Sequence, residues 1–151
     1  MPSHKRKRPK GVVDTSVLVA GIAAFKRAGA RSIVPSAQML RAWIEDDTFQ
    51  WLITEEILDE YKEILAQCKV RRDLIAHAIS LIRTAAQLVP DVPGYGISPD
   101  PDDEPFCACA EVGNADFIVT LNPSDFPQQK LRAHVIAPGD TIPTTGRTRR
   151  R

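Results

Sequence analysis

The fold of this chain is decided by the stretch Val12-Val13-Asp14-Thr15-Ser16-Val17-Leu18-Val19. A short β-branched run ends at the carboxylate of Asp14, and an apolar helical pattern begins almost at once. An acid in this position stands at the carboxyl end of a strand, the edge where open α/β sheets bind their ligands. The stretch therefore predicts an α/β domain with a functional site at that edge.

The rest of the sequence repeats this alternation of short apolar strands with amphipathic helices. Strands are expected at 12–14, 49–53, 117–120 and 135–136, with a short extended piece beginning at Val89. Helices are expected at 17–27, 36–46, 54–68, 73–88 and 103–112, with Ser36 and Thr54 as N-caps. A proline- and glycine-rich loop is expected at 90–101. The pattern favours a three-layer α/β domain with a mainly parallel sheet.

Length and composition are those of one soluble domain. The chain has 151 residues, of which 43% are hydrophobic and 26% charged. The longest uninterrupted apolar run, 17–25, is too short to span a bilayer, which needs about 20 residues. Cys68, Cys107 and Cys109 form no CxxC pair and are expected to be buried free thiols in a reducing compartment. We expect a cytoplasmic protein that does not enter a membrane.

Charge is distributed unevenly along the chain. The net charge is +1, but nine basic residues lie in the end segments 1–10 and 147–151, which leaves a body of about −8. We therefore divide the chain into a basic N-terminal arm (1–11), a globular domain (12–140) and a basic C-terminal tail (141–151). Basic arms on an acidic body suit a polyanion such as nucleic acid. The alternative is that both ends are only solvated tails.

Further carboxylates recur at places comparable to that of Asp14. Glu60 lies at the border of the apolar face of its helix, formed by residues such as Ile57 and Tyr61. Four acids occupy the segment 100–104, and Asp103 heads the apolar stripe of the following helix, which aims it inward. Carboxylates gathered at one edge repel each other unless a cation lies among them. Mg²⁺ prefers oxygen ligands of this kind.

A fourth group of polar side chains follows the strand at 117–120. Thr120 is placed to orient a carboxylate or a water molecule. Asn122 offers a neutral oxygen ligand, and Asp125 offers a charged one. These residues complete a candidate metal site for a hydrolase acting on phosphodiesters.

These stretches together resemble the PIN domain, and most closely the toxin components of bacterial toxin–antitoxin pairs (VapC-like). The resemblance rests on segments 13–18, 54–61, 100–110 and 115–120, and covers about Val12 to Ala137. It implies a three-layer α/β/α fold with a parallel five-stranded sheet of order 3-2-1-4-5. It also implies an endoribonuclease dependent on Mg²⁺ or Mn²⁺, acting as the toxin of a type II pair.

The resemblance also implies a role for each site residue. It places the first, second and third family acids at Asp14, Glu60 and Asp103, and the fourth at Asn122, which is an amide in this chain. The implied metal ligands are the three acids together with Asn122. The implied catalytic groups are the three acids together with Asp125, a possible substitute for the fourth. Supporting positions fall on Thr15, Ser16 and Thr120.

Partners are implied by the same resemblance, namely an RNA substrate, a second copy of the chain and a cognate antitoxin. The first two helices carry more apolar residues than a sheet of short strands obviously needs. These are Leu18, Ile22, Phe25, Leu40 and Trp43. They either belong to the core or form a surface for self-association.

Other phosphate-binding α/β proteins fit the sequence less well. A haloacid-dehalogenase-type phosphatase needs an acid two residues after Asp14, where Ser16 stands. A receiver domain needs a lysine after its last strand, whereas Lys130 precedes it. Neither GxxxxGK[ST] nor GxGxxG occurs. The remaining alternative is a PIN-like module with weak or no catalysis that binds RNA or protein, which Asn122 favours and the three acids oppose.

Overall fold

Five parallel strands form a single sheet in the order β3-β2-β1-β4-β5, the order that the resemblance implies. The three central strands of the sheet are short and mostly buried, which suits a sheet covered on both faces. They are β1 (Lys10–Val13), β2 (Gln50–Ile53), β3 (Gln87–Leu88), β4 (Phe117–Val119) and β5 (His134–Ile136). The first strand lies in the centre, so the residue that follows it emerges in the middle of one sheet edge.

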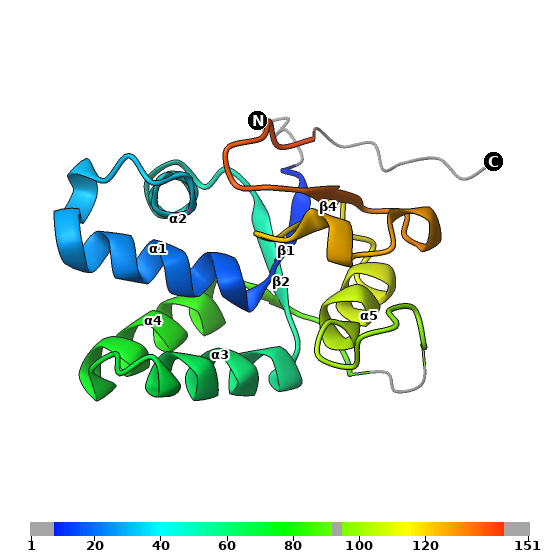
Figure 1. The fold of residues 1–151 in the computed structure, drawn as a ribbon, viewed down its shortest axis with the longest axis horizontal. Helices are drawn as coiled ribbons and strands as arrows, with labels where there is room; N and C mark the ends of the chain where they lie inside the picture. The colour runs from blue at the N-terminus through cyan, green and yellow to red at the C-terminus, as the bar shows by residue number, and fades with distance from the viewer. Residues whose placement is uncertain (1–7, 92–94, 144–151) are drawn as a thin grey trace, which may run out of the picture.

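Helices connect the strands and cover the sheet. They are α1 (Thr15–Ala28), α2 (Pro35–Asp46), α3 (Glu55–Gln67), α4 (Arg72–Ala85) and α5 (Glu104–Val112), with short 3₁₀ turns η1 (Gly29–Arg31), η2 (Pro123–Asp125) and η3 (Gln128–Lys130). Figure 1 shows α1 to α4 on one side of the sheet and α5 on the other. The three-layer α/β/α arrangement is thereby confirmed, and the order of the strands brings their carboxyl ends to one edge.

A cluster of aromatic side chains fills the core beneath α2 and α3. Trp51 lies edge-on to Trp43 at a centroid distance of 4.7 Å, and Phe49 lies edge-on to Phe117 at 5.3 Å. Trp43 is 6% exposed and Trp51 is 1% exposed. Both tryptophans are therefore core residues.

Several element ends differ from those expected. The helix expected at 73–88 ends at Ala85, because the following residues pair with β2 at Leu52↔Gln87 and Ile53↔Leu88. Strand pairing here overrides the helical period of the sequence. The second helix begins at Pro35, whose fixed φ suits the first helical position, so Ser36 lies inside the helix instead of capping it.

Three further expectations require correction. The first helix begins at Thr15, two residues earlier than expected, and Asp14 occupies its N-cap position. The helical spacing of Ile44 from Leu40 predicts that both side chains face inward, but Ile44 is 56% exposed. Cys68 is exposed, whereas Cys107 and Cys109 are buried as expected. The thiols of all three are free.

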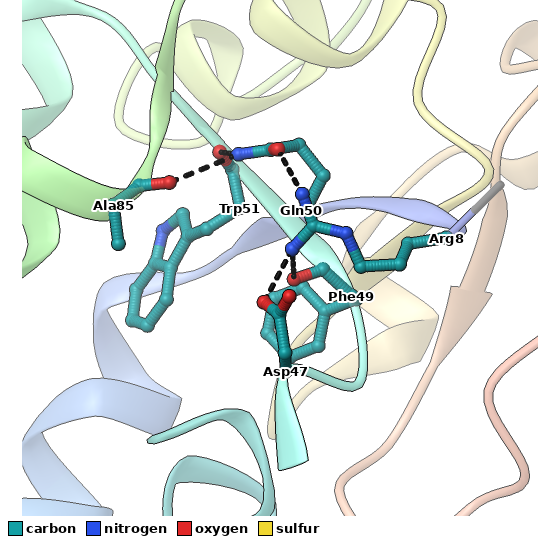
Figure 2. A network of polar contacts seen from close by, with 6 residues as sticks. All are labelled: Arg8, Asp47, Phe49, Gln50, Trp51 and Ala85. Atoms are coloured by element: carbon teal, nitrogen blue, oxygen red, sulfur yellow. Dashed lines mark hydrogen bonds and ion pairs between the residues drawn. The ribbon is translucent and has the colours of Figure 1, made fainter. Parts of the chain in front are cut away.

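Arg8 ties the beginning of the chain to the end of the sheet opposite the strand carboxyl ends. Its guanidinium donates to the carboxylate of Asp47 and, at 2.6 Å, to Oε1 of Gln50. The Gln50 amide donates in turn to the carbonyl of Ala85 at 3.1 Å (Figure 2). This network joins residues before β1, at the start of β2 and at the end of α4. Arg8 and Lys10, which the sequence groups with the basic arm, are thus part of the folded domain.

The computed structural model describes residues 8–91 and 95–143. The remaining parts of the expected arm and tail, 1–7 and 144–151, lie outside the described residues. No helix within the described part is long and apolar enough to cross a membrane.

Gly11 allows β1 to pass close to the ring of Phe117. A Cβ added at this position would lie 2.1 Å from Cζ of Phe117. We predict that Gly11→Ala destabilises the protein by roughly 1–3 kcal/mol, the usual cost of overpacking a core. Urea denaturation measures the change.

The control is the same substitution in a Phe117→Leu background, where the smaller side chain leaves room for the new methyl group. The added cost of Gly11→Ala should shrink in that background. An equal cost in both backgrounds would refute steric contact with Phe117 as the cause.

Candidate functional site

Asp14 is held at the end of β1 by two hydroxyl groups. Ser16 and Thr120 donate to its Oδ2 at 2.7 and 2.8 Å, and neither bond uses Oδ1. The hydroxyls are themselves fixed, since the Leu121 N–H donates to Ser16 at 3.3 Å and the Asn122 N–H to Thr120 at 3.1 Å. The carboxylate therefore has one oriented oxygen, and it joins α1 to the segment after β4.

Glu60 approaches the same edge from α3. Its Oε2 accepts a 2.6 Å hydrogen bond from the hydroxyl of Thr15, the residue next to Asp14. The side chain is half-buried, at the border of the face that packs Ile57, Leu58 and Tyr61. The structure thus joins Glu60 to the turn after β1, although 45 residues separate it from Thr15 in sequence.

Asp103 lies at the N-terminal end of α5, in the N-cap position but without a capping bond from its side chain. The turn before it is shaped by Asp100, whose carbonyl accepts from the Asp103 N–H at 3.0 Å. Glu104 fixes the preceding loop, because its Oε1 accepts from the N–H groups of Ile97 and Ser98 at 2.9 and 2.7 Å. The carboxyl of Asp103 is thereby left half-buried and free of these structural bonds.

A surface hollow of about 560 Å³ opens beside Asp103. Asp103, Asp100, Ser124 and Asp125 line it together with two prolines. Asn122 does not line it, and its backbone N–H is used to fix Thr120. The structure therefore brings Asp125, and not Asn122, to the same hollow as Asp103.

The electrostatics link these carboxyl groups across the edge. The pKa of Asp103 is raised to about 6, first by burial and then by the negative charges of Asp14, Asp100 and Asp125. The pKa of Glu60 is also raised, chiefly by burial and further by the charge of Asp14, although the bond from Thr15 opposes the shift. The carboxyls of Asp103 and Glu60 thus both experience the charge of Asp14.

Tyr61, next to Glu60 in α3, is fully buried behind this edge. Its hydroxyl donates to the carbonyl of Val13 at 2.6 Å and accepts from Nε1 of Trp51 at 3.3 Å. Burial raises the pKa of Tyr61 well above its usual value, so the phenol stays protonated and remains a donor. The backbone just before Asp14 is thus bonded to the helix that carries Glu60.

The carboxyl groups of Asp14, Glu60 and Asp103 suit a hard divalent cation, because such an ion prefers oxygen ligands and would relieve their mutual repulsion. Over residues 8–91 and 95–143, no three His, Cys, Asp or Glu side chains are spaced closely enough to form a ready metal-binding group. The carboxylates of Asp14, Glu60 and Asp103 thus share one electrostatic region without converging on one point.

Comparison with known protein families covers the part of the chain that carries these residues. A family model described as the PIN domain matches residues 10–124, most of the folded chain. The chain belongs to the PIN domain family. PIN domains are usually nucleases that use divalent metal ions, which supports a hydrolase in general. No curated protein matches the chain.

The sequence locates the carboxylates of this PIN domain but not all the groups that support them. Asp14, Glu60, Asp103, Thr15, Ser16 and Thr120 were singled out, and the structure places them at one edge. The hydroxyl of Tyr61 was missed because the residue fits the apolar stripe of α3. The signal was available, since a tyrosine in a buried helical face must find a hydrogen-bond partner. Nothing in the sequence separates Glu104 from its acidic neighbours.

The raised pKa of Asp103 makes a prediction about stability. A carboxyl whose folded pKa exceeds the unfolded value stabilises fully below the unfolded pKa, and this stability is lost as pH rises through about 6. Asp103→Asn should therefore stabilise the protein at about pH 7.5, by on the order of 1 kcal/mol after allowance for solvent screening. At about pH 4.5 the effect should be small, because the carboxyl is then mostly protonated in the folded state.

Urea denaturation at the two pH values measures this difference. Asp46→Asn, at an exposed carboxylate at the end of α2, is the control and should show no comparable pH-dependent gain. A loss of stability in Asp103→Asn at the higher pH would contradict the repulsion described for this edge.

Proposed function

We propose that this PIN domain is an endoribonuclease dependent on Mg²⁺ or Mn²⁺ that hydrolyses RNA phosphodiester bonds. The observation that carries the proposal is the set of coupled carboxyls from three elements, at the end of β1, in α3 and before α5. Asp14, Glu60 and Asp103 would hold the ion, with Asp125 at the adjoining hollow. A bound divalent ion supplies an activated water molecule and neutralises charge on the phosphate.

The residues of the chain prepare the edge for this chemistry. Ser16 and Thr120 occupy one oxygen of Asp14, which leaves Oδ1 for a ligand and fixes its direction. Thr15 similarly fixes one oxygen of Glu60. The hollow beside Asp103 gives a substrate access to the edge, and its negative lining suits RNA only when cations are present. The same negative charge therefore explains why both the binding of RNA and its cleavage would require a cation.

Cleavage of single-stranded RNA in millimolar Mg²⁺ or Mn²⁺ tests the proposal. Asp14→Asn should abolish cleavage, with a loss of at least about 10²-fold, because an amide lacks the charge that holds the ion. The fold should survive, since the amide oxygen can still accept from Ser16 and Thr120. EDTA should have the same effect on the unaltered protein.

Asp116→Asn is a matched control. Asp116 is also a buried aspartate, 6% exposed against 8% for Asp14, but its Oδ2 accepts from the Lys10 N–H at the opposite end of β1. Its substitution should leave cleavage unchanged in a folded protein. Metal-independent cleavage that survives in Asp14→Asn would contradict the proposal. RNA binding without cleavage would favour the alternative of a non-catalytic module, which the amide at Asn122 also favours.

We further propose that the protein is the toxin of a type II toxin–antitoxin pair and forms a homodimer. An apolar groove of about 100 Å³ runs between α1, α2 and α4. Ile44 and Leu81 line it and are 56% and 39% exposed, while Leu18, Leu40 and Trp43 form its buried floor. Apolar side chains exposed together in this way favour burial against a second copy of the chain. An antitoxin would block the acidic edge with a basic side chain.

Light scattering tests the dimer. The unaltered protein should have the mass of a dimer, and Leu81→Asp should be monomeric, because it places a charge in the groove. Leu88→Asp is the control, since Leu88 is 54% exposed on β3 but does not line the groove. The unaltered protein should also slow growth when expressed. A monomeric protein that is harmless to its host would remove the toxin assignment and leave the nuclease proposal intact.

A further inference from the structure

The strands beside Asp14 do not end together. β1 pairs with β2 at Lys10↔Gln50 and Gly11↔Trp51, but its pairing with β4 continues to Val13↔Val119. Beyond Gly11, therefore, the side of β1 that faces β2 has no further strand pair. Backbone groups on that side need other hydrogen-bond partners if they are buried.

The peptide group that joins Val13 to Asp14 is bonded at both of its ends. Its N–H, on Asp14, donates to the carbonyl of Val119 in β4 at 2.9 Å. Its carbonyl, on Val13, points away from β4 and accepts from the hydroxyl of Tyr61 at 2.6 Å. The phenol thus takes the place that a β2 amide would occupy if the strand pairing continued.

The same helix bonds to both neighbours of Asp14. Tyr61 bonds to the carbonyl of the residue before it, and Glu60 accepts from the hydroxyl of Thr15, the residue after it, at 2.6 Å. The phenol is 0% exposed and also accepts from Nε1 of Trp51. The phenol oxygen is therefore bonded to β2 through Trp51 and to β1 through Val13. Because Asp14 directly follows Val13, the position of the phenol affects the position of the Asp14 carboxylate.

We propose that Tyr61 is a positioning residue of the carboxylate site: its hydroxyl anchors the peptide group before Asp14 and sets the distance between Asp14 and Glu60. The inference rests on the proposed metal-dependent function. A phenylalanine would fill the same space in the core, so packing alone does not require the hydroxyl. Without it, the buried carbonyl of Val13 loses its partner, and the peptide group is held only by the bond from the Asp14 N–H to Val119.

Tyr61→Phe tests this role through Mn²⁺ binding, measured by electron paramagnetic resonance, together with RNA cleavage kinetics. Groups that orient metal ligands typically change metal affinity or activity by about 10- to 100-fold when removed. We expect Mn²⁺ to bind at least about tenfold more weakly to Tyr61→Phe, and kcat to fall while KM for RNA changes little. Amide hydrogen exchange at Asp14 should accelerate as an independent sign that its peptide group has loosened.

Ile57→Val is the matched control, because Ile57 is fully buried one turn earlier in α3 and loses only a methyl group. It should lose some stability and keep the Mn²⁺ affinity of the unaltered protein. Equal Mn²⁺ affinity in Tyr61→Phe and the unaltered protein would overturn the inference alone. Equal weakening in both variants would also overturn it, by showing a general effect of core damage. Absence of Mn²⁺ binding in the unaltered protein would instead overturn the proposed function, and this inference with it.

Discussion

The bonds that converge on Asp14 connect the carboxyl-rich edge of the sheet to the rest of the fold. The hydroxyl of Ser16 comes from the first turn of α1, and that of Thr120 from the residue after β4. Both hydroxyls donate to Oδ2 of Asp14, the residue that directly follows the central strand. Because this strand lies in the middle of the sheet, a shift of Asp14 would disturb α1, β4 and the loop beyond it together. The position of the carboxylate is therefore set by the sheet and not by a flexible loop.

The same edge is electrostatically unfavourable on its own. Burial raises the pKa of both Asp103 and Glu60, the charge of Asp14 raises both further, and Asp100 and Asp125 add to the effect at Asp103. The buried core compensates for this repulsion, since Trp51, Phe117 and Tyr61 are almost completely removed from water. A bound cation would relieve this repulsion, and PIN domains generally use divalent metal ions.

Much of this arrangement is readable from the sequence because it depends on local patterns. Asp14 follows a β-branched run, Glu60 borders an apolar helical stripe, and Asp103 begins a helix, so each can be placed by periodicity alone. The order of the strands came from the resemblance to the PIN family. One of the failures was decided by contacts distant in sequence. The residues Gln87 and Leu88 continue a helical pattern but form a strand because β2 offers them partners.

The choice between Asn122 and Asp125 shows a similar limit. Both follow β4 within a few residues, and no spacing rule separates them. The backbone of Asn122 is used to fix Thr120, whereas η2 turns Asp125 toward the hollow beside Asp103. The sequence indicates that the Tyr61 hydroxyl needs a partner but not which one, since that partner is a backbone carbonyl left without a strand partner only where β1 and β2 cease to pair. Such groups depend on where strands diverge, which a pattern of residues does not record.

The most direct test of the account is a crystal structure of the protein grown with Mn²⁺, with anomalous scattering recorded to locate the ion. The account predicts an anomalous peak at the carboxyl edge, in contact with Asp14 and with at least one of Glu60 and Asp103. An intact fold with no peak at this edge at millimolar Mn²⁺, or with the ion bound only elsewhere, would contradict it.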